Sequence, residues 1–162
     1  MILVMEMVAG CVLFTFLFVF SIRKNPLSGL HNMPVVLQER VASMPEYSDV
    51  KVIHVKQRIL KKIPALIILM ILFSVLIMFT GARDFIQGFR NSFLLWFVIK
   101  LYVVFVLDCG WLAHTPSAWI PGTEDMKECY QNYRFYFKSI PGSLAAGTVV
   151  SAIVGVIISM VL

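Results

Sequence analysis

Residues 92–114 read SFLLWFVIKLYVVFVLDCGWLAH, an apolar run that carries Lys100 and Asp108 within it. The run is long enough to cross the ~30 Å hydrocarbon core of a bilayer as a helix. A charged side chain at the centre of a membrane helix costs roughly 2.5–3.5 kcal/mol even on lenient insertion scales. We therefore interpret this stretch as a membrane span in which the two charged residues have a function.

Three more apolar runs accompany it, at about 1–22, 63–82 and 141–162. The chain is 59% hydrophobic and only 14% charged, against roughly 25% charged residues in an average soluble domain. These patterns predict an all-α integral membrane protein, with residues 1–162 forming a single four-transmembrane-helix bundle. We expect short amphipathic interfacial helices in the two long loops, 23–62 and 115–140.

The basic residues of the loops predict the orientation in the membrane. The loop 23–62 holds eight Lys and Arg residues and the loop 115–140 holds three, whereas the loop between the second and third spans has two. Because cytoplasmic loops carry an excess of Lys and Arg, we expect both long loops inside the cell and both termini outside. The setting would be a plasma membrane or a bacterial-type inner membrane. The net charge of +5 then favours contact with anionic lipid and not with nucleic acid, since no aromatic and basic motif accompanies it.

The loops also carry local signals. Residues after Pro34 recur at helical spacing up to Met44, which predicts a short amphipathic helix on the inner membrane surface. Residues 50–62 are expected to extend the second span as a basic stalk, with a short strand at 50–55 as the alternative. The tripeptide Ile-Pro-Gly occurs at 120–122 and at 140–142, and both copies are interpreted as turns.

Glu6 and Lys100 are candidates for an intramembrane ion pair. With the amino terminus outside, both lie about one third of the way into their spans from the same side, and their depths agree within a turn. Pairing would let each charge offset the cost of burying the other. The alternative places Glu6 in water at the outer interface, with Lys100 extending its long side chain towards the same surface.

Asp108 and His114 form a second candidate cluster near the inner end of the third span. In a regular α-helix, Asp108 would lie ~80° around the axis from Lys100, so the two are not expected to be direct partners. A water-filled pocket at Asp108 and His114 could handle a proton, a metal or a polar substrate. In the structural alternative, Asp108 bonds a neighbouring helix and His114 is merely interfacial. No pair of potential metal ligands has the spacing of a known metal-binding motif, and the sequence identifies no cofactor.

The fourth run contains small residues at every fourth position. Such a stripe forms a groove into which another helix can pack closely, either within the bundle or between subunits. Its members are Ser143, Gly147, Ser151, Gly155 and Ser159.

These features favour an oligomeric transporter- or channel-like subunit whose intramembrane charges handle an ion or a small polar solute. The alternatives are an inner-leaflet enzyme acting on a lipid or lipophilic substrate, and an accessory or scaffold subunit of a larger membrane complex. The absence of a nucleophile elbow and of a phosphate loop in the sequence disfavours the enzyme alternative, and enzymatic activity is left open. The four-span layout is similar to that of the trimeric membrane-bound glutathione transferases. Their Arg, Asn and Glu pattern is not found around Arg58 to Pro64, so the resemblance assigns no site residue.

Overall fold

The computed structural model describes the backbone of residues 1–47 and 55–161, and the side chains of those residues except 55–62 and 65. Every secondary-structure element in this part of the chain is helical. The long helices are α1 (Ile2–Lys24), α3 (Val55–Phe79), α4 (Phe85–Tyr102) and α6 (Tyr133–Val161), and a π-helical segment, η3 (Val103–Leu112), continues α4. The short elements are η1 (Pro26–Asn32), α2 (Val35–Ala42), η2 (Pro45–Tyr47), η4 (Pro116–Ala118), η5 (Glu124–Met126) and α5 (Lys127–Tyr130).

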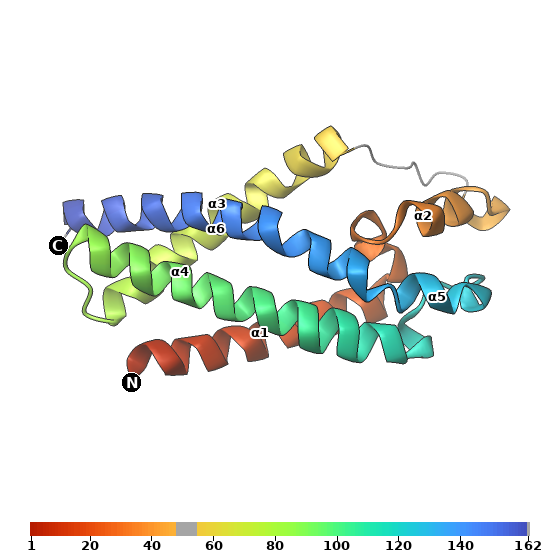
Figure 1. The fold of residues 1–162 in the computed structure, drawn as a ribbon, viewed down its shortest axis with the longest axis horizontal. Coiled ribbons are helices and arrows are strands. Elements are labelled where there is room, and N and C mark those ends of the chain that lie inside the picture. The colour runs from red at the N-terminus through yellow and green to blue at the C-terminus, as the bar shows by residue number, and fades with distance from the viewer. Residues whose placement is uncertain (48–54, 162) are drawn as a thin grey trace.

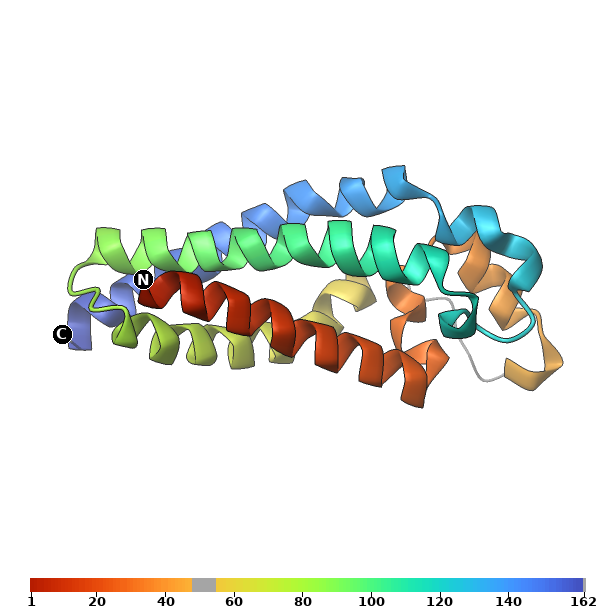
Figure 2. The same cartoon turned by 90° about the horizontal axis from the view of Figure 1, so that it is seen from below.

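The long helices lie alongside one another in an elongated bundle (Figures 1 and 2). The two chain termini lie at one end, which we call the terminal end. The short helices α2 and α5 gather at the other end, which we call the capped end (Figure 1). This arrangement is compatible with both termini on one side of a membrane, and the predicted topology stays a prediction.

Three helical stretches in the described residues are long and apolar enough to cross a membrane: Ile2–Lys24, Phe85–Leu112 and Tyr133–Val161. They support a helical protein that crosses the membrane more than once. The predicted second span falls in α3, where the apolar stretch Leu66–Phe79 is shorter, so a four-span bundle is not shown. Helix α3 already begins at Val55, as expected for a helical stalk, whereas residues 50–54 of that prediction lie outside the described residues.

The third span starts earlier than predicted. We expected residues 83–91 to be a loop, but α4 begins at Phe85 because Asp84 caps it. The Asp84 carboxylate accepts a hydrogen bond of 2.8 Å from the backbone N–H of Gln87, which satisfies one of the free donors of the first turn. The aspartate followed three residues later by glutamine is a helix-start signal that we overlooked in the sequence.

The fourth span also starts earlier, at Tyr133, and Pro141 lies inside α6. Our interpretation of residues 140–142 as a turn is therefore wrong, whereas the turn at Pro121 and Gly122 is confirmed, with Gly122 at a φ of 83°. Proline removes one helical hydrogen bond, yet membrane helices tolerate it when neighbouring helices supply the packing. Helix α6 nevertheless continues through Pro141 to Val161.

The stripe of small residues on α6 packs against α4 within the same chain. Gly155 lies so close that a Cβ atom there would be 2.9 Å from the backbone oxygen of Phe85. Two turns of the helix away, Gly147 lies against the Trp96 ring, whose Nε1 donates to Ser143 O at 3.0 Å. The middle of the stripe is buried, Ser143 is half-buried and Ser159 is exposed. Of the two roles left open by the sequence, packing inside the bundle is the one observed.

The connecting segments form a compact cap with its own apolar core. Helix α2 contributes Leu37 and Val41, both fully buried, and these pack in one cluster with Ile22 of α1 and Leu112 of η3. The short helix after Pro34 is thus confirmed. Leu37 and Val41 of its apolar face pack on protein, whereas Val36 is exposed. Two loops that are far apart in sequence therefore close the capped end together.

Candidate functional site

A cavity of about 350 Å³ lies between α1, η1, η3 and α6, next to the cap. Its walls are aromatic on two sides, with Phe14 and Phe18 from α1 and Phe135 from α6. Its polar lining consists of Asn32, Lys100, Asp108, Tyr136 and Ser139. We call this space the capped-end cavity. Two of the predicted intramembrane candidates, Lys100 and Asp108, thus share one cavity.

A short chain of hydrogen bonds fixes Lys100 at the wall of the capped-end cavity. Its Nζ donates to Ser139 Oγ at 3.0 Å, and Ser139 Oγ donates in turn to the backbone oxygen of Tyr136 at 2.6 Å. Both partners belong to α6, one turn apart. The ammonium group is therefore held by a neighbouring helix at the wall of the cavity.

The π-helix η3 brings Asp108 towards Lys100. At its end, the Ala113 N–H donates to the carbonyl oxygen of Asp108, five residues earlier. The corresponding bond in an α-helix joins residues four apart, so the π-helix has wider turns. Each residue of a π-helix advances less around the axis than the ~100° of an α-helix residue. Residue 108 therefore does not reach the ~80° offset expected of a regular helix. Both residues line one cavity, whereas the expectation that they are not direct partners stays a prediction.

Tyr136 links the capped-end cavity to the cap. Its hydroxyl donates to the backbone oxygen of Tyr130 at 3.2 Å. The Tyr130 ring is completely buried, stacks on Trp119 with 4.8 Å between ring centroids, and bonds Thr123 Oγ1 and the Ile120 N–H through its hydroxyl. Burial raises the pKa of Tyr130, so the phenol stays neutral at physiological pH. The floor of the cavity is therefore a rigid, hydrogen-bonded part of the cap.

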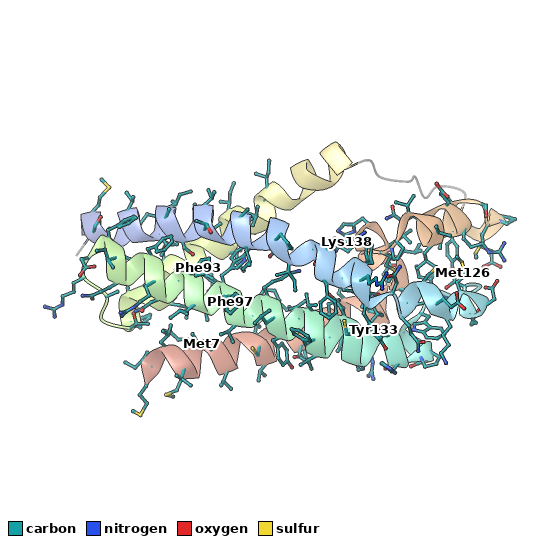
Figure 3. The ribbon with its side chains drawn as sticks, viewed as in Figure 1. Met7, Phe93, Phe97, Met126, Tyr133 and Lys138 are labelled. Carbon is teal, nitrogen blue, oxygen red and sulfur yellow. The ribbon has the colours of Figure 1, made fainter. Side chains whose placement is uncertain are left out.

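His114 lies outside the capped-end cavity, on an exposed surface. Its Nδ1 is 3.0 Å from the Gly110 carbonyl, which can only accept, so Nδ1 carries the proton. Nε2 then accepts from the Tyr133 hydroxyl at 3.4 Å, and the two rings stack. Tyr133 lies at the capped end, at the start of α6 (Figure 3). The predicted cluster of Asp108 with His114 is thus divided between a cavity and a surface.

Glu6 lines a different cavity, of about 460 Å³, between α1, α3 and α4. The other side chains around this space, which we call the Glu6 cavity, are apolar and include Leu72, Phe73 and Leu95. Met7 marks this part of α1, towards the terminal end (Figure 3). Lys100 lines the capped-end cavity, so the contacts of these two residues fall in separate spaces, and the Glu6–Lys100 pair stays a prediction.

A third, smaller cavity of about 170 Å³ lies between the other two along the bundle. It shares Lys100 with the capped-end cavity, and Phe73 and Ile99 with the Glu6 cavity. Phe14 lines all three. Three spaces thus follow one another along α1 and α4, with a single aromatic ring common to all of them.

The sequence did not single out Phe14, Tyr136 or Ser139 as site residues. Phe14 is one of several phenylalanines in α1, and nothing in their spacing distinguishes it. Ser139 and Tyr136 were placed in a loop, because the start of α6 was set at 141. A helix beginning at Tyr133 would have put both of them one turn apart and in reach of the third span.

Comparison with models of known protein families, with curated proteins and with solved structures found no match. Within residues 1–47 and 55–161, no three His, Cys, Asp or Glu side chains gather as ligands for a metal ion. The case for a function therefore rests on the cavities and their charged residues.

Proposed function

We propose that the chain is a four-span membrane protein of transporter or channel type that binds an ion or small polar solute between Lys100 and Asp108. The observation that carries this proposal is that both charges line one cavity of about 350 Å³. This volume falls in the range of small-molecule sites, which combine apolar walls with a few convergent polar groups. Intramembrane charges that face such a space commonly mark a solute pathway.

Helix α3 supplies the fourth span in this proposal. It has 25 residues, and at ~1.5 Å per residue it is roughly 37 Å long, enough to cross a ~30 Å hydrocarbon core. Its first turns lean away from the bundle at the capped side (Figure 1). Because the basic residues of α3 lie in these turns, the helix can leave the hydrocarbon before they begin.

The charge distribution supports a cytoplasmic capped end. Arg23 and Lys24 end α1 there, and Lys138 lies on the same side (Figure 3). The turn between α3 and α4 at the terminal end has only Arg83 and Arg90 beside it. Under the positive-inside rule, the cap faces the cytoplasm and both termini face outward. Anionic lipid headgroups are then the expected partners of the capped end.

Two observations favour solute passage over surface catalysis. The three cavities follow one another from Asp108 to Glu6, as a path through the bundle requires. The enzyme alternative relied on Asp108 and His114 together, and His114 lies outside the cavity. Phe14 lines all three cavities and would therefore lie beside the proposed path along its length.

We also propose self-association, although the small-residue stripe on α6 no longer supports it. The small-residue stripe on α6 is filled by α4 and therefore offers no groove to a second copy. One four-helix protomer is small for a private pathway, which is the remaining reason to expect an oligomer. Native mass spectrometry in a mild detergent would give the subunit number directly.

Binding can be tested before the solute is known. The purified protein would be heated in the presence of inorganic ions, small zwitterions, organic anions and organic cations, one class at a time. We expect at least one class to raise the Tm of the wild type, and we expect Lys100→Met and Asp108→Asn to lose this response. His114→Ala is the matched control and should keep it. No response in the wild type, or equal responses in all variants, would overturn the proposal.

A solute that passes this test would then be offered to the protein in lipid vesicles. Flux that depends on Lys100 and Asp108 would support transport. Chemical conversion of the solute without flux would instead support the enzyme alternative. Binding without either would support the accessory role.

A further inference from the structure

We propose that the Glu6 cavity is a second binding site, which takes a lipophilic organic cation. Its apolar walls would hold the body of the ligand, and the Glu6 carboxylate would hold its positive charge. The site lies in the terminal half of the bundle and uses none of the polar groups of the capped-end cavity. Its charged ligand contact is therefore distinct from those of the solute site at Lys100 and Asp108.

The Glu6 carboxylate is the first observation behind this proposal. Its Oε2 atom is buried and has no hydrogen-bond partner among the described residues. A buried polar atom without a partner costs about 1–3 kcal/mol, and more if it is charged. Natural proteins retain few such atoms, and each one calls for an explanation such as a ligand or a catalytic role.

The cavity around Glu6 is the second observation. It has a volume of about 460 Å³, within the range of sites for drug-sized ligands. Its walls come from three helices, with Leu13 on α1, Leu76 on α3 and Leu95 on α4. Glu6 supplies the one charged side chain among the residues that line it.

Charge complementarity selects the class of ligand. A small hydrated ion would lose its water in an apolar cavity and gain only one carboxylate, which repays little of the desolvation cost. An organic cation with a delocalised or shielded charge loses much less hydration. It also buries apolar surface against the leucines, at ~25 cal/mol per Å². The face of Phe73 can add a cation–π contact.

Tetraphenylphosphonium is a suitable test cation, and tetraphenylborate is an anion of the same shape. Binding of each to the purified protein would be measured by isothermal titration calorimetry in mild detergent. We expect the wild type to bind the cation at least tenfold more tightly than the anion. Glu6→Gln should weaken cation binding at least tenfold, whereas Glu39→Gln, at an exposed position on α2, should leave it unchanged.

Two further variants separate this site from others and from misfolding. Glu6→Asp keeps the charge and should retain most of the binding. Lys100→Met should bind the cation like the wild type, which distinguishes this site from the capped-end cavity. Equal affinity for cation and anion, unchanged cation affinity in Glu6→Gln, or no binding by the wild type would each overturn the proposal.

Discussion

The contact between Gly147 and Trp96 gives the sharpest test of the packing. A Cβ atom added at Gly147 would overlap Trp96 Cδ1 and lie 2.6 Å from Nε1. Real Cβ contacts are essentially never this short, so the indole must move. Trp96 is 9% exposed, and its Nε1 donates to Ser143 O, so the ring cannot move without losing packing and a hydrogen bond.

We therefore expect Gly147→Ala to be destabilising, although alanine favours helices. Overpacking costs roughly 1–3 kcal/mol. The lost Trp96 hydrogen bond adds ~0.5–1.5 kcal/mol. Replacing glycine by alanine in a helix returns about 1 kcal/mol. The net expectation is a loss of roughly 1–3 kcal/mol in the free energy of unfolding.

Gly142→Ala is the matched control on the same helix. A Cβ atom there would meet nothing within 4 Å, so only the helix-propensity gain applies. Both variants would be unfolded by increasing the fraction of a denaturing detergent, with helix content followed by circular dichroism. We expect Gly142→Ala to equal or exceed the wild type and Gly147→Ala to fall clearly below it. Equal stability of the two variants would refute the α4–α6 register described above.

The remaining predictions concern the cap and the start of α4. Tyr130→Phe leaves the buried Ile120 N–H without its acceptor and removes one of the two hydrogen bonds of Thr123 Oγ1, which still donates to Ile120 O. We expect a loss of about 1–3 kcal/mol and faster proteolysis of the cap. Tyr133→Phe is the exposed control and should change neither. Because burial raises the folded-state pKa of Tyr130 above its usual 10.0, its contribution is complete below pH ~10 and is lost as the pH rises through the folded-state value, so alkaline melting should be less steep in Tyr130→Phe. Asp84→Ala removes the cap of α4 and should cost ~1 kcal/mol in the same detergent titration, and an unchanged midpoint would contradict the capping role.

Much of the architecture could be predicted from runs of apolar residues. Lipid removes water as a hydrogen-bonding partner, so a long apolar run has almost no alternative to a helix. The three helical stretches that are long and apolar enough to cross a membrane were found in this way, and the stripe that includes Gly147 correctly indicated close helix packing. The boundaries were less accurate because they depend on single capping contacts, such as the one made by Asp84.

The π-helix is the feature that the sequence could not supply. No residue pattern between Val103 and Leu112 distinguishes π from α hydrogen bonding, since both satisfy every interior backbone group. The change of winding nevertheless decides which face Asp108 occupies. With 3.6 residues per turn, Asp108 was expected on a different face of the helix from Lys100, whereas both residues line one cavity in the structure.

The cap was hidden for a different reason. Its core joins residues from two loops, such as Leu37 from the first and Tyr130 from the second, and their contact depends on tertiary packing. Within each loop, the apolar spacing suits a membrane surface as well as a protein core. The environment of these apolar residues depends on whether the two loops pack against each other.

A double-mutant cycle on Lys100 and Asp108 tests most directly whether the two charges share a cavity. The free energies of unfolding of the wild type, Lys100→Met, Asp108→Asn and the double variant would be measured in the same detergent titration. Residues that interact show coupling of about 0.5–3 kcal/mol, whereas independent sites add within ~0.3–0.5 kcal/mol. We expect coupling above 0.5 kcal/mol, with the double variant less destabilised than the sum of the single ones. Simple additivity would show that the two charges act apart and would remove the basis of the proposed solute site.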